Sequence, residues 1–196
     1  MTRKAKIVVY EGPDAIGKKT QSMLLYNFLL SRNYKVSLYE IPFRNRLYSS
    51  IYYMLYNGHA IKFPITFMII QFLNKLFFEY FVLRKSLKEN DIIILDRWRL
   101  STYVYGYCTS KSNFLSKLLM YLSKKPDITF VFEGKSFKRD NQDVYEKNNN
   151  LQEDIRIMYH EFANKHSNDH FIVNANQEKK EILEQIFMRL QEKKIV

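Results

Sequence analysis

Five short apolar runs recur along the chain, and longer segments with helical periodicity separate them. The runs cover residues 7–10, 35–40, 91–96, 128–133 and 170–173, and each is predicted to form a strand. Helical spacing of apolar residues predicts helices near residues 24–29, 45–57, 64–88, 115–122, 151–165 and 178–193. The third run is aliphatic from Ile92 to Leu95, which is typical of a strand covered on both faces. Alternating strands and helices predict an α/β layered fold with a parallel sheet.

Length and composition favour one domain over residues 1–196. The chain has 196 residues and 46% hydrophobic content, enough for one core but not for two ordinary domains. Polar residues interrupt the most apolar segment, 62–83, so we expect an amphipathic buried helix there and no membrane span. The opening MTRKAK is not followed by the long apolar core of a signal peptide, and Cys108 has no second cysteine to pair with. We therefore expect an intracellular, cytoplasmic protein.

The net charge of +11 suggests a polyanionic partner. Nucleic acid, an acidic membrane surface and phosphorylated small molecules all fit this charge. A biased composition that places lysines on solvated faces fits it equally well, so charge alone does not choose among them.

The run EGPDAIGKKTQ, residues 11–21, contains most of a phosphate-binding loop. Gly12 and Gly17 with Lys18 match the pattern G-x-x-x-x-G-K-[ST], between a predicted strand and a predicted helix. Such glycines let backbone N–H groups surround phosphate oxygens, while the helix start and the lysine add positive charge. The residues expected to bind the donor phosphates are Gly12, Pro13, Ala15, Ile16, Gly17, Lys18, Lys19 and Thr20.

Two residues of this run are unusual. Lys19 stands where a hydroxyl normally contacts Mg²⁺, and an ammonium cannot ligate a cation. Either Asp96 holds the metal with nucleotide oxygens and water, or Lys19 points away and Thr20 partly substitutes. Asp14 is a carboxylate beside bound phosphate, so we expect it to face a hydroxyl or a cation; the alternative is a turn-stabilising aspartate.

Four motifs together resemble the thymidylate kinase family of nucleoside monophosphate kinases. They are EGPDAIGKKTQ, DRWRLSTYVYG at residues 96–106, KPDITFVFE at 125–133 and DVYE at 143–146, in the family's order and spacing. The resemblance covers about residues 7 to 159. It implies a P-loop NTPase-type three-layer fold, with a central parallel five-stranded sheet and helices on both faces.

The resemblance assigns roles to residues near the loop. Asp14 would reach the sugar hydroxyl of the acceptor, Asp96 would lie near Mg²⁺ directly or through water, and Arg97 would lie near the phosphates being joined. Trp98 replaces the usual tyrosine. Ser101 and Tyr105 match the family's serine and an aromatic that flanks the acceptor; the alternative for Asp96 and Arg97 is a surface ion pair.

The resemblance also implies an acceptor pocket. Arg44, or alternatively Arg46, would hold the acceptor phosphate. The family's F-x-x-x-R pattern, counted back from Asp96, falls on Phe72 and Leu76, so a leucine stands where the arginine is expected. Either Lys75 or Asn74 would then read the base, or no residue does. Phe72 fits the hydrophobic core equally well.

A short lid is expected near residues 134–146. Arg139 is the preferred lid arginine and Lys138 its competitor, and closure would exclude water. Tyr145 of DVYE would approach the acceptor sugar or base, with Gln152 beside it.

The implied reaction moves the γ-phosphoryl of ATP to the 5′-phosphate of dTMP, with dUMP as a second substrate and Mg²⁺ as cofactor. Lys18, Arg97, Asp14 and Arg139 would form the catalytic group. Two alternatives remain: a deoxynucleoside kinase, and a basic nucleic-acid-binding protein. A homodimer formed through helices of the segment 45–88 is expected, and neither a membrane nor a nucleic acid is expected as a partner.

Overall fold

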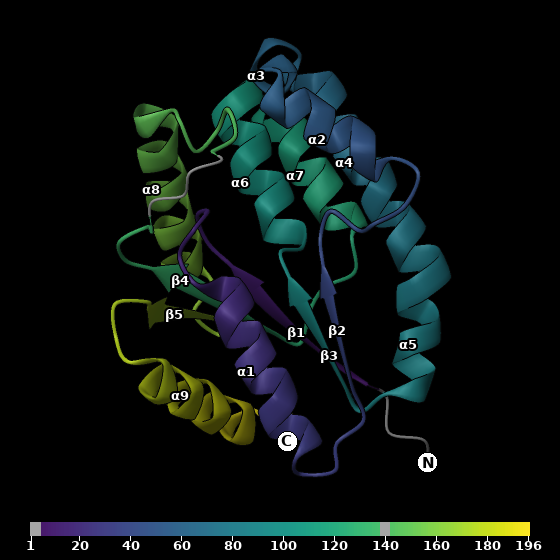
Figure 1. Cartoon of the computed structure of the whole chain (residues 1–196), viewed down its shortest axis with the longest axis vertical. Coiled ribbons are helices and arrows are strands. Elements are labelled where there is room, and N and C mark those ends of the chain that lie inside the picture. Colours follow the sequence, from purple (N-terminus) through teal and green to yellow (C-terminus); the bar gives the residue numbers. More distant parts are fainter. Residues whose placement is uncertain (1–4, 138–141) are drawn as a thin grey trace.

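The computed structural model describes residues 5–137 and 142–196 and shows a single parallel sheet in these residues (Figure 1). Its strand order is β2-β3-β1-β4-β5, and every neighbouring pair is parallel. The strands are β1 (Lys6–Glu11), β2 (Val36–Glu40), β3 (Ile92–Asp96), β4 (Ile128–Glu133) and β5 (His170–Asn174). The sequence prediction of a five-stranded parallel sheet is confirmed.

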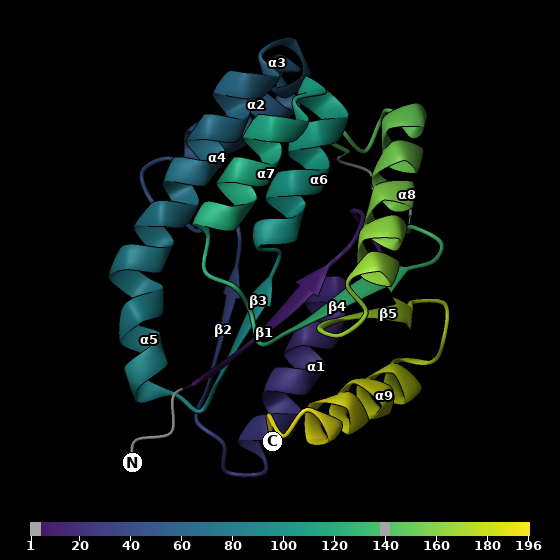
Figure 2. The same cartoon turned by 180° about the vertical axis from the view of Figure 1, so that it is seen from behind.

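Helices cover both faces of the sheet and its carboxyl edge (Figures 1 and 2). Two of them, α1 and α9, pack side by side on one face, and α5 and α8 pack on the other side. The remaining helices gather beyond the carboxyl ends of the strands. The helices are α1 (Lys18–Leu30), α2 (Tyr48–Tyr56), α3 (His59–Lys62), α4 (Pro64–Phe78), η1 (Glu79–Leu83), α5 (Arg84–Glu89), α6 (Arg99–Ser110), α7 (Asn113–Leu122), α8 (Asn149–Lys165) and α9 (Lys179–Glu192).

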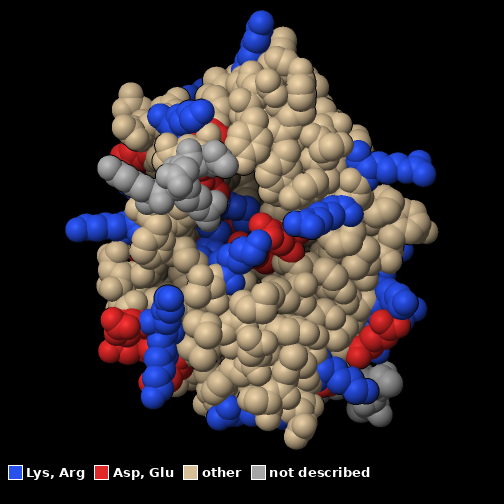
Figure 3. Space-filling view, in the orientation of Figure 1, with Lys and Arg blue, Asp and Glu red and all other residues tan. Residues whose placement is uncertain are grey.

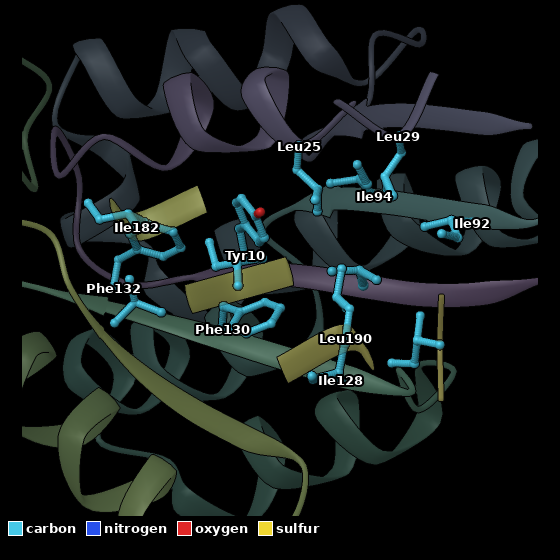
Figure 4. Packing of buried hydrophobic residues seen from close by; sticks show 14 of the residues in the cluster. Tyr10, Leu25, Leu29, Ile92, Ile94, Ile128, Phe130, Phe132, Ile182 and Leu190 are labelled. Carbon is cyan, nitrogen blue, oxygen red and sulfur yellow. The ribbon is translucent and has the colours of Figure 1, made fainter. Parts of the chain in front are cut away.

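Alternation along the strands divides the core between the two faces of the sheet. Tyr10 of β1 packs with Leu25 of α1 and Ile182 of α9 (Figure 4), whereas its neighbour Val9 packs with Leu83 on the opposite face. All five side chains are buried. Burial of a large apolar side chain stabilises a fold by about 1.5–3 kcal/mol, so both helical layers hold the sheet in place.

Helix α6 was not predicted from the sequence. Its segment RLSTYVYGYCTS contains β-branched residues, aromatics and Gly106, which lower intrinsic helix propensity. Tertiary packing stabilises the helix despite this low propensity, because α6 lies against α4, α7 and α8. A Cβ on Gly106 would lie 2.6 Å from Met68 Sδ and 2.8 Å from Ser116 Oγ. The glycine therefore permits the close approach of α6 to α4 and α7.

The predicted helix 64–88 exists but is not a uniform α-helix. A π-helical turn, η1, separates α4 from α5, and such turns add one residue within a helix. By length and composition the segment Pro64–Glu89 could cross a membrane, but core helices of soluble proteins pass the same test, and 33% of its most apolar window is buried. One side of α4 packs inward and the other is exposed, as expected for an amphipathic helix.

Candidate active site

A cavity of about 500 Å³ lies beyond the carboxyl ends of the strands. Its wall is formed by the phosphate-loop run, the ends of β2 and β3, and side chains from α2, α4 and α6. Figure 3 shows a hollow near the middle of this face, in which basic and acidic side chains gather. Ligands of open parallel sheets bind at this edge, so the cavity is the candidate active site.

The phosphate-loop run has the backbone conformation that anion binding requires. Gly12 has a φ of 135°, and a Cβ there would lie 2.6 Å from the Phe132 carbonyl oxygen. Ala15 and Gly17 also have positive φ, 54° and 92°, and Gly17 is the N-cap of α1. Left-handed residues at a helix start turn backbone N–H groups toward an anion. The structure therefore supports a phosphate cradle at residues 12–17.

Lys18 is the first residue of α1 and is buried under this loop. Its ammonium donates to the Pro13 carbonyl oxygen and lines the cavity. Burial, assisted by the nearby charge of Arg97, lowers the pKa of Lys18 from 10.5 to about 8, although carboxylates nearby oppose the shift. Solvent therefore does little to stabilise the charge of the Lys18 ammonium, which favours the binding of an anionic ligand.

Asp14, Arg97 and Tyr105 form a connected group beside Lys18. Arg97 Nη1 donates to the Gly12 carbonyl oxygen at 3.0 Å, and Nη2 pairs with the Asp14 carboxylate. The Tyr105 hydroxyl donates to Asp14 Oδ2 at 2.6 Å. Burial acts to raise the pKa of Asp14, but Arg97, Lys18 and the Tyr105 hydrogen bond outweigh it and lower that pKa. Asp14 is thus an ionised carboxylate facing a cation and a hydroxyl.

Sequence reasoning missed the buried Glu11, which organises the start of α6. Its Oε1 accepts from the backbone N–H groups of Trp98, at 2.9 Å, and Ser101, at 3.1 Å. Its Oε2 accepts from the hydroxyls of Ser101 and Tyr159. A charged acceptor at free N–H groups stabilises a helix start. Glu11 therefore fixes Ser101 at the cavity wall, and the only signal in the sequence was its place beside Gly12.

Asp96 and Thr20 also line the cavity, as predicted for the metal site. Asp96 is 7% exposed, and its Oδ1 accepts no hydrogen bond from any described residue. Burial raises the pKa of Asp96, while Lys18 and Arg97 oppose the rise. An unpartnered buried carboxylate oxygen is suited to a cation or its bound water. No set of three or more His, Cys, Asp or Glu side chains in residues 5–137 and 142–196 could hold a metal alone, so nucleotide oxygens would have to complete the site.

Lys19 does not lie beside Lys18 at the loop centre. Its ammonium contacts Glu40 Oε2 at 3.0 Å, at the end of β2, and both side chains line the cavity. The sequence left open whether this lysine points away, and the structure directs it to the β2 edge of the cavity.

Helix α4 presents Gln71 and Lys75 to the cavity, not Phe72. Phe72 is buried against Met68 and Leu119 in the core, the alternative weighed for it. The predicted pattern, counted back from Asp96, therefore falls one residue after the two side chains of α4 that line the cavity. Gln71 was missed, because no motif in the sequence singles it out.

Lys75 is a buried cation held by neutral groups. Its Nζ donates to the Trp98 carbonyl oxygen at 2.7 Å and to the Thr102 hydroxyl, and none of the ion pairs found among the described residues involves it. Burial lowers its pKa from 10.5 to about 8. Asn74, the other predicted base reader, instead exchanges two 2.8 Å hydrogen bonds with the Phe43 backbone. Asn74 thus fixes the segment after β2.

Of the other predicted acceptor residues, Tyr145 lines the cavity, whereas Gln152, Arg44 and Arg46 do not. Tyr145 lines the cavity 5.6 Å from the Tyr105 ring, and the buried Gln152 donates to the Tyr145 carbonyl oxygen at 3.0 Å without lining the cavity. Arg44 is exposed, with its guanidinium 5.8 Å from the Tyr48 ring, and neither it nor Arg46 lines the cavity.

The lid residues Arg139 and Lys138 lie outside the described residues. The adjoining Phe137 donates its backbone N–H to the Ala15 carbonyl oxygen at 2.7 Å and lines the cavity. The start of the predicted lid segment therefore lies against the phosphate loop.

Comparison with known proteins gives one consistent answer. A family model described as thymidylate kinase matches residues 10–186. The curated thymidylate kinase of Roseiflexus castenholzii is 31% identical over 64% of this chain and 57% of its own length, and that of a second Roseiflexus strain is 29% identical over 64% and 58%. The chain thus spans a little over half the length of these relatives.

Solved structures agree on the fold. The thymidylate kinase of Ehrlichia chaffeensis has a TM-score of 0.73 and 21% identity over 96% of this chain and 99% of its own. That of Candida albicans has a TM-score of 0.78 and 18% identity over 98% and 93%. The family model covers the whole phosphate-loop run, the DRWRLS segment and the helices that line the cavity, so the chain belongs to the thymidylate kinase family.

Proposed function

We propose that this chain transfers the γ-phosphoryl group of ATP to the 5′-phosphate of dTMP. The observation that carries the proposal is the convergence of Lys18, Arg97 and the ionised Asp14 on one cavity under a phosphate cradle. Two fixed cations suit two nucleotides whose phosphates must approach each other. Asp14 suits a sugar hydroxyl, because an ionised carboxylate only accepts hydrogen bonds.

The chemistry needs no protein nucleophile. The acceptor phosphate oxygen is already anionic near neutral pH, so the protein has to orient it and offset charge in the transition state. Lys18 would hold donor phosphate oxygens, and Arg97 would lie between donor and acceptor. Mg²⁺, when bound with ATP, would neutralise phosphate charge, and Asp96 and Thr20 are the predicted residues to hold it.

Lys75 and Gln71 are the proposed base-reading pair. An ammonium only donates, so Lys75 favours a base with a carbonyl oxygen, as in thymine and uracil, over the amino group of cytosine. The Gln71 amide can donate or accept beside it. We therefore expect dTMP and dUMP to be preferred over dCMP, and Lys75→Met to reduce that preference by about tenfold.

The two alternative functions have less support. A deoxynucleoside kinase would need Asp14 or Asp96 as a base to deprotonate a hydroxyl. Asp14 is unsuited because its pKa is lowered and Arg97 and Tyr105 engage it, and Asp96 is the residue proposed to face Mg²⁺. For nucleic-acid binding, Figure 3 shows lysine and arginine side chains around the rim and in the central hollow of this face, without a continuous basic stripe across it.

A coupled ADP-release assay tests the proposed function. With ATP and Mg²⁺ we expect turnover with dTMP, less with dCMP and none with free nucleosides. Lys18→Ala should lower kcat/KM by roughly a thousandfold, since it removes a fixed charge on the phosphates. Lys165→Ala on α8 is the matched control, because this exposed lysine does not line the cavity. Turnover of nucleosides in preference to dTMP would refute the proposal.

We also infer a homodimer and a cytoplasmic location, where ATP is available. The outward side of α4 and η1 exposes Leu73, Phe77 and Phe81, and the adjacent α7 exposes Phe114 and Tyr121. Large exposed apolar patches on soluble proteins mark interaction sites, and a second copy of the chain would cover the same helices by two-fold symmetry.

Sedimentation velocity tests this association. The wild-type chain should sediment as a dimer, and Leu73→Glu should shift it toward the monomer. Ile157→Glu on α8 is the matched control, because Ile157 is equally exposed (48% for both) but lies on another helix. A monomeric wild type, or binding to lipid vesicles in place of self-association, would contradict the inference.

A further inference from the structure

Glu40 lies directly beside the proposed metal-binding aspartate. It is the last residue of β2, in register with Asp96 at the end of β3, and both residues line the cavity. Adjacent strands in register bring such side chains close together. Two carboxylates therefore stand at the carboxyl edge of the sheet, on the side of the phosphate loop where Lys19 replaces the hydroxyl.

Asp96 independently indicates a missing ligand at this place. The carboxylate is buried, yet its Oδ1 has no donor among the described residues. A buried polar atom without a partner is destabilising, and a cation or its coordinated water would remove this cost.

The Lys19–Glu40 ion pair is easily opened. The two side chains are 71% and 53% exposed, and ion pairs between exposed side chains contribute little to stability. In this contact the Lys19 ammonium occupies an oxygen of Glu40, and it would repel a divalent cation bound there. A divalent cation carries twice the charge and would displace the ammonium from Glu40 at little cost.

We propose that Glu40 supplies the metal-facing oxygen that the loop lacks, directly or through water, and that Lys19 is its replaceable counter-ion when no metal is bound. The proposal rests on the proposed binding of ATP in this cavity. Mg²⁺ keeps several waters and uses one or two carboxylates besides phosphate oxygens, so Asp96 and Glu40 match its requirement.

Manganese binding gives a test that does not depend on turnover. Free Mn²⁺ is measured by electron paramagnetic resonance during titration of the protein with a non-hydrolysable ATP analogue. We expect Glu40→Gln to weaken Mn²⁺ binding to the protein–nucleotide complex by about tenfold, and Lys19→Ser to strengthen it severalfold. The control is the exposed pair Lys85–Glu89 on α5, whose equivalent substitutions, Lys85→Ser and Glu89→Gln, should change nothing.

The double variant separates the two roles of Glu40. If Glu40 faces the metal, Glu40→Gln weakens Mn²⁺ binding in the Lys19→Ser background as well. If Glu40 only neutralises Lys19, the substitution has no effect in that background, and the proposal is wrong. Absence of Mn²⁺ binding in the wild-type complex also overturns it, whereas failure of the proposed phosphoryl transfer would show only in the ADP-release assay.

Discussion

Lys75 provides a test of the structure that needs no substrate. In the unfolded chain its pKa should be near the ordinary value of 10.5, whereas burial lowers it to about 8 in the folded protein. Between these values the unfolded state binds the proton and the folded state does not. The free energy of unfolding must then rise with pH across this window, because stability increases wherever the unfolded state holds more protons.

The shift sets the size of this effect. One pKa unit corresponds to about 1.4 kcal/mol, so the full window is worth roughly 3 kcal/mol. Integration from about pH 7 to about pH 9.5 gives a rise of about 2 kcal/mol from Lys75 alone. The range stops below the ordinary pKa of tyrosine, because buried tyrosines such as Tyr159 keep their protons longer than unfolded ones and oppose the rise.

The assay is urea unfolding at the two pH values for the wild type, Lys75→Met and the control Lys88→Met. Lys88 is exposed on α5, so its loss should leave the pH dependence unchanged. Lys75→Met should make the rise smaller by about 2 kcal/mol, and the difference cancels the contributions of all other groups. Equal rises in the wild type and in Lys75→Met would refute the view of Lys75 as a buried, poorly compensated cation.

Three further predictions follow from single contacts. Gly106→Ala should lower the free energy of unfolding by about 1–3 kcal/mol in urea titrations, because its Cβ would meet Met68, and Met68→Ala should recover part of the loss; an unchanged midpoint would argue against the tight packing. Tyr105→Phe removes a hydrogen bond that positions Asp14, so it should raise the KM for dTMP severalfold and leave the KM for ATP unchanged. A change confined to the KM for ATP would show that Tyr105 acts on the donor side. Because the pKa of Lys18 is about 8, ATP affinity measured by fluorescence should fall as pH rises above about 8, where the ammonium is lost, and the fall should vanish in Lys18→Ala.

The sheet and the phosphate loop could be predicted from the sequence because local signals specify both. A buried parallel strand needs a short apolar run, and all five such runs became strands. The loop needs glycines where φ is positive, and Gly12 and Gly17 occupy such positions.

The missed features depend on contacts between distant residues. Helix α6 forms although its own residues favour it weakly, because its packing against three other helices outweighs propensity. Glu11 became a helix-capping residue through Trp98 and Ser101, almost ninety positions away in the chain. The sequence pattern pointed to Phe72, whereas Gln71 and Lys75 line the cavity, because which side of α4 faces inward depends on its packing against other helices.

Helix α4 contributes side chains both to the cavity and to the outer surface of the molecule. Gln71 and Lys75 face inward, Leu73 and Phe77 face outward, and Asn74 clamps the backbone of Phe43 between them. Because these residues share one helix, a ligand that restricts the motion of α4 from the cavity also restricts the motion of its outer side. If the proposed dimer forms through this outer surface, occupancy of the pocket and dimerisation would be thermodynamically linked, and each would change the affinity of the other by the same factor.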